Sequence, residues 1–437
     1  MNYSKRLHNI IPGGAHTYSR GDDQFPANAP SILSHGKGSH VWSPEGNEYI
    51  DYGMGLRSVN LGYGNEEVAK AVYDEVLKGN NLTRASLTEL AAAELLPALV
   101  PSAEMVKFAK HGSTVTTAAV KLARAYTGRK YIAIPQEQPF FSFDDWFIGS
   151  TVINRGVPEE SSRFTLKFNY NNLASLEAHF EQYPGQIAAV MMEAATTVVP
   201  IAANGEPKKH FLHQVKELCH KHGALFIIDE MITGFRWHLQ GAQAYFDIEP
   251  DLSTFGKAMA NGFAVAALTG KKEIMGIGGI LEEGAERVFL TSTTHGAEMS
   301  ALGAFIKTVE ILQRENVVAH FWKYGGDLVN GMNALSKELG IQDHFYAEGF
   351  ACSPNYITKD RDGAASLAFR TLFSQEMINQ GVLMPYIALS MAHSATDLEQ
   401  TLHAVKKALT VYVKALNEGI EAYLKSPVIK PVFRKYN

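Results

Sequence analysis

Apolar positions in the middle of the chain follow two different spacings. Residues 66–77 and 87–100 space them as one face of an amphipathic helix does, and Pro101 follows the second segment. After Pro101, short apolar runs typical of buried strands alternate with helical spacing. The predicted strands span 105–108, 131–134, 188–192, 225–228 and 264–268, and the predicted helices span 116–127 and 211–222. This alternation predicts a mostly parallel sheet that helices cover on both faces.

The two ends of the chain have other patterns. Within residues 36–52, the apolar pairs Val41-Trp42 and Tyr49-Ile50 flank a Ser-Pro-Glu-Gly-Asn turn, which predicts a β-hairpin. From residue 296 onward helical spacing dominates, with strands predicted near 351–357 and 381–385 and a final helix from 396 to 416 or beyond. We therefore expect three segments, namely the N-terminal part of a small lobe (1–60), a large domain (61–295) and a small C-terminal α/β domain (296–437).

The composition is that of a folded globular protein. Apolar residues make up 46% of the 437 residues and charged residues 19%. The net charge of −5 is spread without long blocks of one sign, so we expect neither nucleic acid nor an anionic membrane as a partner. No segment has the ~18 consecutive apolar residues of a membrane span, and none resembles a signal peptide. Cys219 and Cys352 have no metal-like or redox-like spacing, so we expect no metal site, no disulfide and a cytoplasmic location.

One acidic pair directly follows a predicted strand. The apolar run 225–228 ends in Asp229-Glu230. Open parallel sheets bind ligands beyond the carboxyl ends of their strands, so Asp229 is a candidate ligand contact. By itself this position is weak evidence, because acidic residues at strand ends also cap helices or meet solvent.

A lysine occupies a second unusual position. Lys257 lies between the apolar segment 250–255 and a small-residue turn at Asn261-Gly262. From such a position a lysine can reach into a pocket instead of lying along a solvated helix. Most lysines are nevertheless surface residues, so Lys257 needs support from other positions.

A third segment suits a phosphate group. Residues 110–117, Lys-His-Gly-Ser-Thr-Val-Thr-Thr, open the predicted helix 116–127. Gly112, Ser113 and Thr114 offer backbone N–H groups, hydroxyl donors and the positive end of a helix dipole. An ordinary helix N-cap has the same composition. Neither a Walker lysine nor a GxGxxG motif is present here, so nucleotide-binding loops are disfavoured.

A single cofactor accounts for all three features. Pyridoxal 5′-phosphate has a phosphate for the helix start, an aldehyde that a lysine traps as a Schiff base, and a ring nitrogen that needs a carboxylate partner. On this hypothesis Lys257 holds the cofactor and later moves the proton of the substrate Cα, while Asp229 keeps the ring nitrogen protonated.

The sequence around these residues resembles the class III aminotransferases over nearly its whole length, and most closely the glutamate-1-semialdehyde aminomutase branch. The similarity is strongest in 223–236 (GALFIIDEMITGFR) and 250–257 (PDLSTFGK), with further matches at 11–14 and 121–129. The resemblance implies an α/β fold of the fold-type I, aspartate aminotransferase-like class. It further implies a mostly parallel seven-stranded sheet in the large domain, a smaller α/β lobe built from both termini, and pyridoxal phosphate as the cofactor.

The resemblance also assigns roles to individual residues. Gly112 and Ser113, with Thr114 beside them, match the phosphate-binding small residues of the family, and Glu193 stands where the family has a Glu-Pro pair. Besides Lys257, these residues and Asp229 are therefore expected to bind the cofactor.

Two further residues are assigned in the same way. Phe140 stands where an aromatic side chain stacks on the pyridine ring, and packing in an aromatic core is the alternative. Thr294 resembles a threonine that contacts the phosphate of the neighbouring subunit, which implies a homodimer with shared active sites.

Several positions depart from the family pattern. The usual Ser-Gly-Thr-Glu-Ala is His-Gly-Ser-Thr-Val here, and the aromatic-His-Gly motif is Phe140-Phe141-Ser142. Ser390 stands where the aminomutase has a glutamate that helps to gate the site, which weakens the aminomutase interpretation. Arg20 matches an arginine used for the substrate carboxylate, so we expect a carboxylate pocket, with a surface arginine as the alternative.

We therefore expect a pyridoxal-phosphate aminotransferase that acts on two small molecules by a ping-pong reaction through the pyridoxamine form. The amino group passes from an amino-acid donor, with L-glutamate favoured, to a keto or aldehyde carbon of a sugar-like acceptor. The acceptor class follows from a likeness of 110–113 and 140–149 to members associated with bacterial surface-sugar biosynthesis. Two alternatives stay open, an aminomutase and a noncatalytic binding protein on the same fold. Retention of Lys257 and Asp229 argues against the second.

Overall fold

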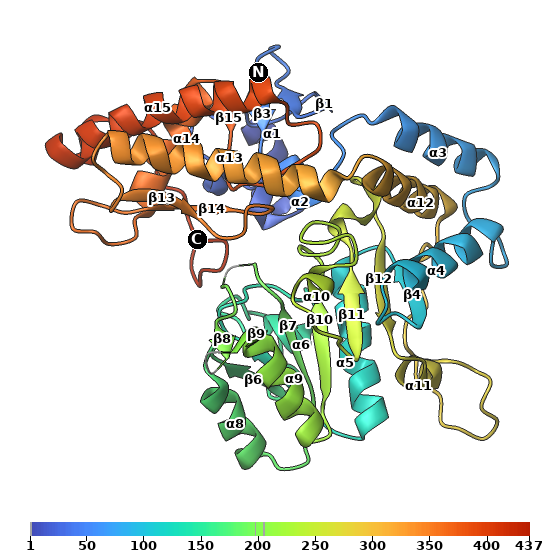
Figure 1. The fold of residues 1–437 in the computed structure, drawn as a ribbon. Coiled ribbons are helices and arrows are strands. Elements are labelled where there is room, and N and C mark those ends of the chain that lie inside the picture. Colours follow the sequence, from blue (N-terminus) through green and yellow to red (C-terminus); the bar gives the residue numbers. More distant parts are fainter. Residues whose placement is uncertain (1, 197, 204–205) are drawn as a thin grey trace. The chain divides into compact units, whose positions relative to one another are not determined.

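The computed structural model describes residues 2–196, 198–203 and 206–437 (Figure 1). These residues form two compact units. The terminal unit combines Met1–Glu66 with Asn316–Val432, and the central unit combines Glu67–Glu315 with Phe433–Asn437. The expected division at residues 60 and 295 differs from these boundaries mainly in helix α12 (Met299–Arg314). This helix belongs to the central unit, where it packs against α4 (Leu87–Leu99).

The central unit is built around a seven-stranded sheet with strand order β4-β12-β11-β10-β7-β5-β6. Neighbouring strands are parallel except at β12, which runs opposite to both β11 and β4. This sheet confirms the predicted α/β fold class. The strands are β4 (Met105–Ala109), β5 (Tyr131–Pro135), β6 (Thr165–Phe168), β7 (Ile187–Glu193), β10 (Leu225–Asp229), β11 (Leu252–Phe255) and β12 (Ala266–Gly270).

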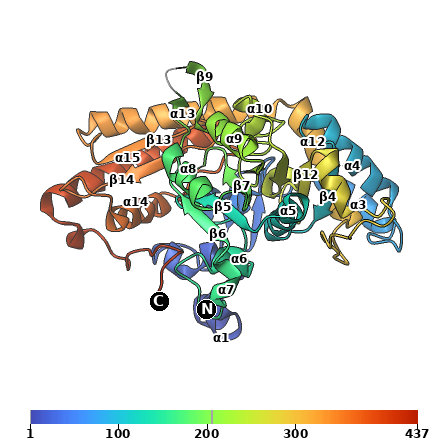
Figure 2. The same ribbon diagram turned by 90° about the horizontal axis from the view of Figure 1, so that it is seen from below.

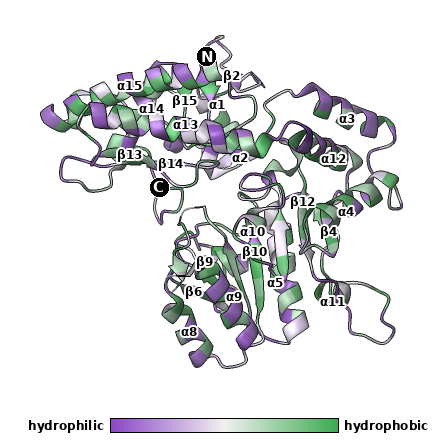
Figure 3. Cartoon of the chain, in the orientation of Figure 1, coloured by the Kyte–Doolittle hydropathy of each residue, from purple (hydrophilic) through white to green (hydrophobic). Residues whose placement is uncertain are grey.

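Helices connect these strands and cover the sheet. Besides α4 and α12, they are α3 (Glu66–Leu77), α5 (Gly112–Thr127), α6 (Asp145–Ile148), α7 (Glu159–Ser162), α8 (Leu173–Gln182), α9 (Phe211–Lys221), α10 (Ala242–Tyr245) and α11 (Lys272–Met275). A short pair of strands, β8 (Ala202–Ala203) and β9 (Glu206–His210), precedes α9. In Figure 3 the strand β10 is coloured hydrophobic, whereas α9 carries hydrophilic residues.

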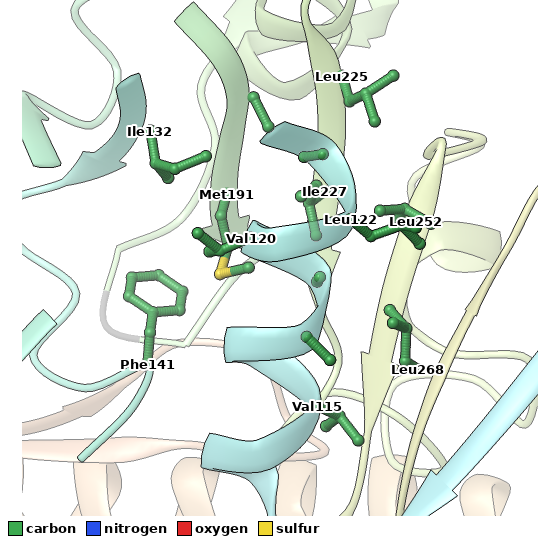
Figure 4. Close-up of a cluster of buried hydrophobic side chains, with 14 of the residues drawn as sticks. Val115, Val120, Leu122, Ile132, Phe141, Met191, Leu225, Ile227, Leu252 and Leu268 are labelled. Atoms are coloured by element: carbon green, nitrogen blue, oxygen red, sulfur yellow. The ribbon is translucent and has the colours of Figure 1, made fainter. Parts of the chain in front are cut away.

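Helix α5 packs on one face of the sheet. Its buried residues Val115 and Leu122 meet Ile227 of β10 in one hydrophobic cluster (Figure 4). The neighbouring strand residues Phe226 and Ile228 are also buried but do not belong to this cluster. Because successive strand residues point to opposite faces, β10 is covered on both sides and its carboxyl end lies inside the protein.

The terminal unit joins the two ends of the chain through a four-stranded sheet of order β1-β2-β3-β15. The predicted hairpin forms β2 (His40–Trp42) and β3 (Glu48–Asp51), with β1 (His35–Lys37) beside β2, and β15 (Val382–Leu383) adds in parallel to β3. The remaining elements are α1 (Tyr3–Ile10), α2 (Met54–Arg57), α13 (Val317–Glu338), β13 (Phe345–Glu348), β14 (Asn355–Thr358), α14 (Leu367–Asn379) and α15 (Ala395–Glu418).

Three long helices fill one side of this terminal unit. Helix α15 packs against both α13 and α14, and Figure 2 shows the three helices together from below. Within the described ranges of the whole chain, no helix is both long and apolar enough to cross a membrane.

Candidate active site

Three strands of the central sheet bring polar side chains to their carboxyl ends. Asp229 is the last residue of β10, and in the strand register it lies opposite Glu193 of β7 and Thr254 of β11. All three side chains are buried. Because parallel strands end at the same edge, these residues share the edge of the sheet at which ligands of such folds bind.

The Asp229 carboxyl group is enclosed by protein, with 2% of the residue exposed. Its Oδ1 accepts hydrogen bonds from the Met231 backbone N–H (2.9 Å) and the Thr254 hydroxyl (3.0 Å). Oδ2 receives none from the residues that the structure describes. Burial raises the pKa of Asp229 to about 6, although Lys257 and the two hydrogen bonds act in the opposite direction. One oxygen of a buried carboxylate is thus left for a cationic donor of a ligand.

The neighbouring Glu230 has a different environment. Its carboxylate accepts the backbone N–H groups of Ala242 and Gln243, both at 2.9 Å, and so holds the segment that follows β10. Burial raises its pKa, while hydrogen bonds from these residues lower it. Of the Asp-Glu pair, Glu230 supports the loop and Asp229 remains the ligand candidate.

Lys257 stands in an uncommon backbone conformation. It begins a short helical turn, Lys257–Ala260, directly after β11 and Gly256. Its φ is +42°, and Asn261 at the end of the turn has φ +44°. Non-glycine residues in this left-handed region cost on the order of 1–3 kcal/mol each, so the surrounding structure must hold them there. The positive charge of Lys257 lowers the pKa of Asp229 and so opposes the effect of burial.

Helix α5 begins at Gly112, earlier than residue 116, where the apolar spacing placed its start. Gly112, Ser113 and Thr114 therefore form its first turn. The Thr114 N–H donates to the His111 carbonyl (3.2 Å), and N–H groups of a first turn otherwise have no acceptor within the helix. Ser113 is buried and its Oγ accepts the N–H of Phe143 (3.0 Å), while Thr114 Oγ1 lies 2.9 Å from Nδ1 of His111. A phosphate at this end would meet backbone donors and the positive end of the helix dipole.

The start of α5 and the Lys257 turn converge on one side chain. A Cβ atom added at Gly112 would lie 2.9 Å from Sδ of Met231, and one added at Gly256 would lie 2.5 Å from the same sulfur. The structure therefore brings the segments of Gly112, Asp229 and Lys257 together within the central unit.

Phe140 lies on a segment that is tied to the end of β7. The Gln138 side chain binds the Glu193 backbone twice, donating to its carbonyl (2.8 Å) and accepting its N–H (2.9 Å). Phe140 itself is 46% exposed and meets the ring of Phe147 edge-on, with ring centroids 5.8 Å apart. Phe141, in contrast, is buried in the hydrophobic cluster under α5. The exposure of Phe140 favours its interpretation as a ligand contact over packing in the core.

Thr294 is exposed in the single chain, and its carbonyl accepts a hydrogen bond from Asn81 Nδ2 (3.0 Å). The same segment is tied to the residue before the His-Gly-Ser-Thr motif, because Glu298 forms ion pairs with Lys110 and with His295 (2.9 Å). Thr294 therefore stands close in the fold to the start of α5, at the surface of the central unit.

Arg20 and Ser390 both lie in the terminal unit. Arg20 lines a cavity of about 580 Å³ within this unit, together with Leu56 and Tyr386. Ser390 is fully buried and is not among the residues that line this cavity. Its hydroxyl donates to the Asn60 carbonyl (3.2 Å). These contacts favour a structural role for Ser390, whereas Arg20 faces a cavity.

Sequence patterns did not single out Thr254, Met231 or Gln138. Thr254 and Met231 bind the carboxyl group of Asp229, and Gln138 fixes the end of β7. Only knowledge of the strand order could have revealed Thr254, because its place opposite Asp229 is set by the register of β10 and β11. For Met231 the signal in the sequence is indirect. Gly112 and Gly256 lack side chains, which is consistent with a large neighbour at both positions.

The residues of this edge fit pyridoxal phosphate. Asp229 presents an enclosed carboxyl oxygen suited to a ring N–H, and Lys257 supplies the amine that the aldehyde needs. The two glycines leave room for the Met231 side chain, because a Cβ at either position would meet its sulfur.

Comparison with known proteins identifies the same family. A sequence model of the class III aminotransferases matches residues 19–387. The chain is 33% identical over 426 residues to a 3-aminobutyryl-CoA aminotransferase from Cloacimonas acidaminovorans (strain Evry), covering 95% of this chain and 98% of that protein. It is 31% identical to a glutamate-1-semialdehyde 2,1-aminomutase from Aquifex aeolicus (strain VF5), covering 92% and 96%.

A solved structure agrees with these relatives. The FumI protein of Sphingopyxis sp. MTA144, solved with pyridoxal phosphate, superposes with a TM-score of 0.84 at 25% identity and covers 95% of this chain and 97% of its own. The predicted resemblance and the predicted cofactor are thereby confirmed. The chain belongs to the class III aminotransferases and is an enzyme that uses pyridoxal phosphate.

Proposed function

We propose that this enzyme transfers an amino group from L-glutamate to an aldehyde or keto carbon of a small, sugar-like acceptor. The observation that carries the catalytic part of the proposal is the buried Asp229 at the sheet edge, with Oδ2 open and Lys257 close enough to lower its pKa. The donor and the acceptor class rest on the family resemblance and on the sequence departures at 110–113 and 140–149.

Each residue of the site has a defined task in this proposal. Bound pyridoxal phosphate supplies an aldehyde for the substrate amine and a ring that accepts electrons from the substrate Cα. Asp229 holds a proton on the ring nitrogen through Oδ2, because Oδ1 is already engaged by Met231 and Thr254. Lys257 would hold the cofactor through Nζ, and the same Nζ would move the proton at the substrate Cα.

The remaining cofactor contacts come from three segments of the central unit. We assign the phosphate to the backbone and hydroxyl groups of Gly112, Ser113 and Thr114 in the first turn of α5. Phe140 is assigned to the face of the pyridine ring. Glu193, at the end of β7 beside Asp229, is assigned as a further contact of the cofactor.

Arg20 is proposed to bind a substrate carboxylate. The cavity that it lines has mostly apolar walls, and Arg20 is the basic side chain among the described residues around it. Two acidic residues, Asp22 and Asp51, also line this cavity. The Asp51 carboxylate accepts the N–H groups of Gly53 (2.7 Å) and Met54 (3.0 Å) and the hydroxyl of Tyr63 (2.6 Å). The Asp22 carboxylate accepts the Ser4 hydroxyl and lies 3.2 Å from Nε2 of His8. Because protein groups engage both carboxylates, we assign the guanidinium of Arg20 to the substrate anion.

A single-turnover experiment tests the reaction type. The holoenzyme is mixed with glutamate alone, and absorbance follows the conversion of bound cofactor to its amine form while 2-oxoglutarate is measured. An aminotransferase completes this half-reaction, whereas an aminomutase converts its own amino-aldehyde substrate without an external donor. No spectral change with glutamate, alanine or glutamine would refute the proposed reaction.

The acceptor needs a separate screen of the amine form. Keto-sugars are compared with 2-oxo acids, with glutamate-1-semialdehyde and with 3-oxobutyryl-CoA, because relatives carry the names of the last two substrate types. Return of the aldehyde spectrum only with keto-sugars supports the proposed acceptor class. If the aldehyde spectrum returns faster with 3-oxobutyryl-CoA, the sugar-like acceptor class is wrong and the acceptor is an acyl thioester.

We also propose a cytoplasmic homodimer. Thr294 is exposed in the single chain, and the family likeness assigns it to the phosphate site of the neighbouring subunit. Its exposure is therefore expected if a second subunit covers it. Large apolar side chains on α3, on α4 and in the loop between these helices are also exposed, namely Tyr73 (62%), Val76 (48%), Leu77 (69%), Leu82 (51%), Leu87 (85%) and Leu90 (53%). Apolar surface of this kind is typical of subunit contacts. Both cysteines are free thiols, which agrees with a reducing compartment.

Sedimentation velocity tests this surface. The parent protein should sediment as a dimer, and Leu87→Glu should shift it toward the monomer because the new charge would be buried in the contact. Leu367→Glu, at a 40% exposed position on α14, serves as the matched control. A parent protein that stays monomeric at micromolar concentration would refute the dimer.

A further inference from the structure

Met231 follows the Asp-Glu pair and fills a notch between two glycines. Its residue is 7% exposed and belongs to the hydrophobic cluster under α5. A Cβ at Gly112 would approach its Sδ to 2.9 Å and its Cε to 3.4 Å. A Cβ at Gly256 would approach the same atoms to 2.5 Å and 3.3 Å. The end of the Met231 side chain therefore touches both the first turn of α5 and the residue before Lys257.

At these two glycines the backbone conformation does not demand glycine, whereas an added Cβ would meet the Met231 thioether. Gly256 has φ −179°, which is extended backbone that any residue adopts, and Gly112 lies in a helical turn. Any side chain at either position would displace the Met231 thioether or be displaced by it. The unbranched, polarisable thioether is suited to fill such an irregular gap between two backbone segments.

Met231 also contacts the third element of the site. Its backbone N–H donates to Oδ1 of Asp229 (2.9 Å), the oxygen that also accepts the Thr254 hydroxyl. One residue thus touches the segment proposed to bind phosphate, the segment that carries the lysine, and the carboxylate proposed to bind the ring nitrogen. These groups must hold opposite ends of one rigid ligand, so the distance between them is a functional quantity.

We propose that Met231 is a positioning residue, whose thioether sets the separation between the first turn of α5 and the Lys257 turn. The proposal rests on the proposed roles of Gly112, Asp229 and Lys257. It predicts that substitutions at Met231 and Gly256 have coupled effects on cofactor binding. A Cβ added at Gly256 would disturb the site by displacing the Met231 sulfur, so its effect depends on that sulfur.

A double-mutant cycle on cofactor binding tests this coupling. Apo-protein is titrated with pyridoxal phosphate for the parent, Gly256→Ala, Met231→Ala and the double variant, and the visible absorbance reports attachment to Lys257. Gly256→Ala should raise the dissociation constant by about tenfold or more, because the Cβ forces the sulfur and the two segments apart. Met231→Ala should raise it by about threefold to tenfold. Adding Met231→Ala to Gly256→Ala should recover affinity to within about threefold of Met231→Ala alone.

Two control variants separate positioning from general stability. Met191→Ala removes a fully buried methionine of the same hydrophobic cluster, and it should lower the unfolding temperature without rescuing Gly256→Ala. Gly276→Ala adds a Cβ where no atom lies within 4 Å, and it should leave binding unchanged. If Met231→Ala does not fold, Gly112→Ala and Gly256→Ala still test the notch, since both must weaken binding in folded protein.

The outcomes distinguish this role from the proposed function. Multiplicative effects of Met231→Ala and Gly256→Ala, or unchanged binding in Gly256→Ala, would overturn the positioning role. Borohydride reduction of the parent with pyridoxal phosphate, followed by peptide mapping, tests the site itself. A label at Lys257 together with an uncoupled cycle sinks only the role of Met231, whereas a missing label sinks the proposed site.

Discussion

The charge of Asp229 is expected to destabilise the protein when no cofactor is bound. We therefore predict that Asp229→Asn makes the apo-protein more stable at neutral pH. Asparagine has nearly the same shape, and its carbonyl oxygen can still accept the Met231 N–H and the Thr254 hydroxyl. The substitution removes the charge from a position where 2% of the residue is exposed.

The size of the effect follows from the pKa. Burial raises the pKa of Asp229 from 3.8 to about 6, so the folded state holds a proton that the unfolded chain releases at lower pH. Stability of the parent apo-protein therefore falls as the pH rises from about 4 to about 6 and levels off above that window. At ~1.4 kcal/mol per pKa unit, the buried charge costs about 3 kcal/mol at pH 8.

Urea unfolding of the two apo-proteins from pH 4 to pH 8 checks this prediction. The advantage of Asp229→Asn should be near zero at pH 4 and should grow to about 3 kcal/mol at pH 8. Asp251→Asn is the control with the opposite sign. Burial alone would raise the pKa of Asp251, but hydrogen bonds from Lys271, Phe226 and His220 outweigh it and hold the pKa below its usual value. Its loss should therefore destabilise the protein at neutral pH. An advantage of Asp229→Asn that is absent at pH 8, or that does not change with pH, would refute the reasoning.

Four other changes test the remaining parts of the site and fold. In the holoenzyme, Asp229→Asn should slow turnover by several powers of ten at ~1.4 kcal/mol each, and steady-state rates within a few-fold of the parent would contradict its role. Lys257→Ala should abolish turnover and the borohydride label while weak cofactor binding persists in absorbance titrations. Arg20→Gln should raise KM for the carboxylate substrate about tenfold with little change in kcat, whereas a surface role would leave both constants unchanged. Burial lowers the pKa of His393 to about 4, although Asp397 among other groups raises it, so stability should be lost as the pH falls from 6.5 to 4. Thermal melts should show a smaller loss in His393→Gln.

The sequence predicted the sheet and the place of Asp229 because both depend on local patterns. A run of apolar residues followed by Asp-Glu predicts a buried strand with a carboxylate at its end, and β10 ends at Asp229. The start of α5 was predicted too late, because Gly112 and Ser113 are poor helix formers although the first turn includes them. The apolar spacing begins only where the helix faces the core.

Other features depend on contacts between distant segments and had no local signal. The sequence indicates β11 (Leu252–Phe255) only as an apolar segment, and this pattern does not predict that Thr254 lies opposite Asp229. The left-handed conformation of Lys257 has no local signal, because the residue at that position is not a glycine. The family resemblance suggests a gating position for Ser390, but its burial and its bond to the Asn60 carbonyl become visible only in three dimensions.

The features that we propose to serve catalysis make the site unfavourable without a cofactor. Asp229 is a carboxylate held away from water, and Lys257 and Asn261 occupy backbone conformations that cost on the order of 1–3 kcal/mol each. A ligand that binds only the folded state stabilises it in proportion to the logarithm of its concentration over its dissociation constant. Pyridoxal phosphate should therefore raise the unfolding temperature of the parent, because its ring nitrogen supplies the positive charge that Asp229 lacks. In Asp229→Asn the apo-protein starts from a more stable state and the cofactor adds less, so the two proteins should differ most when no cofactor is present.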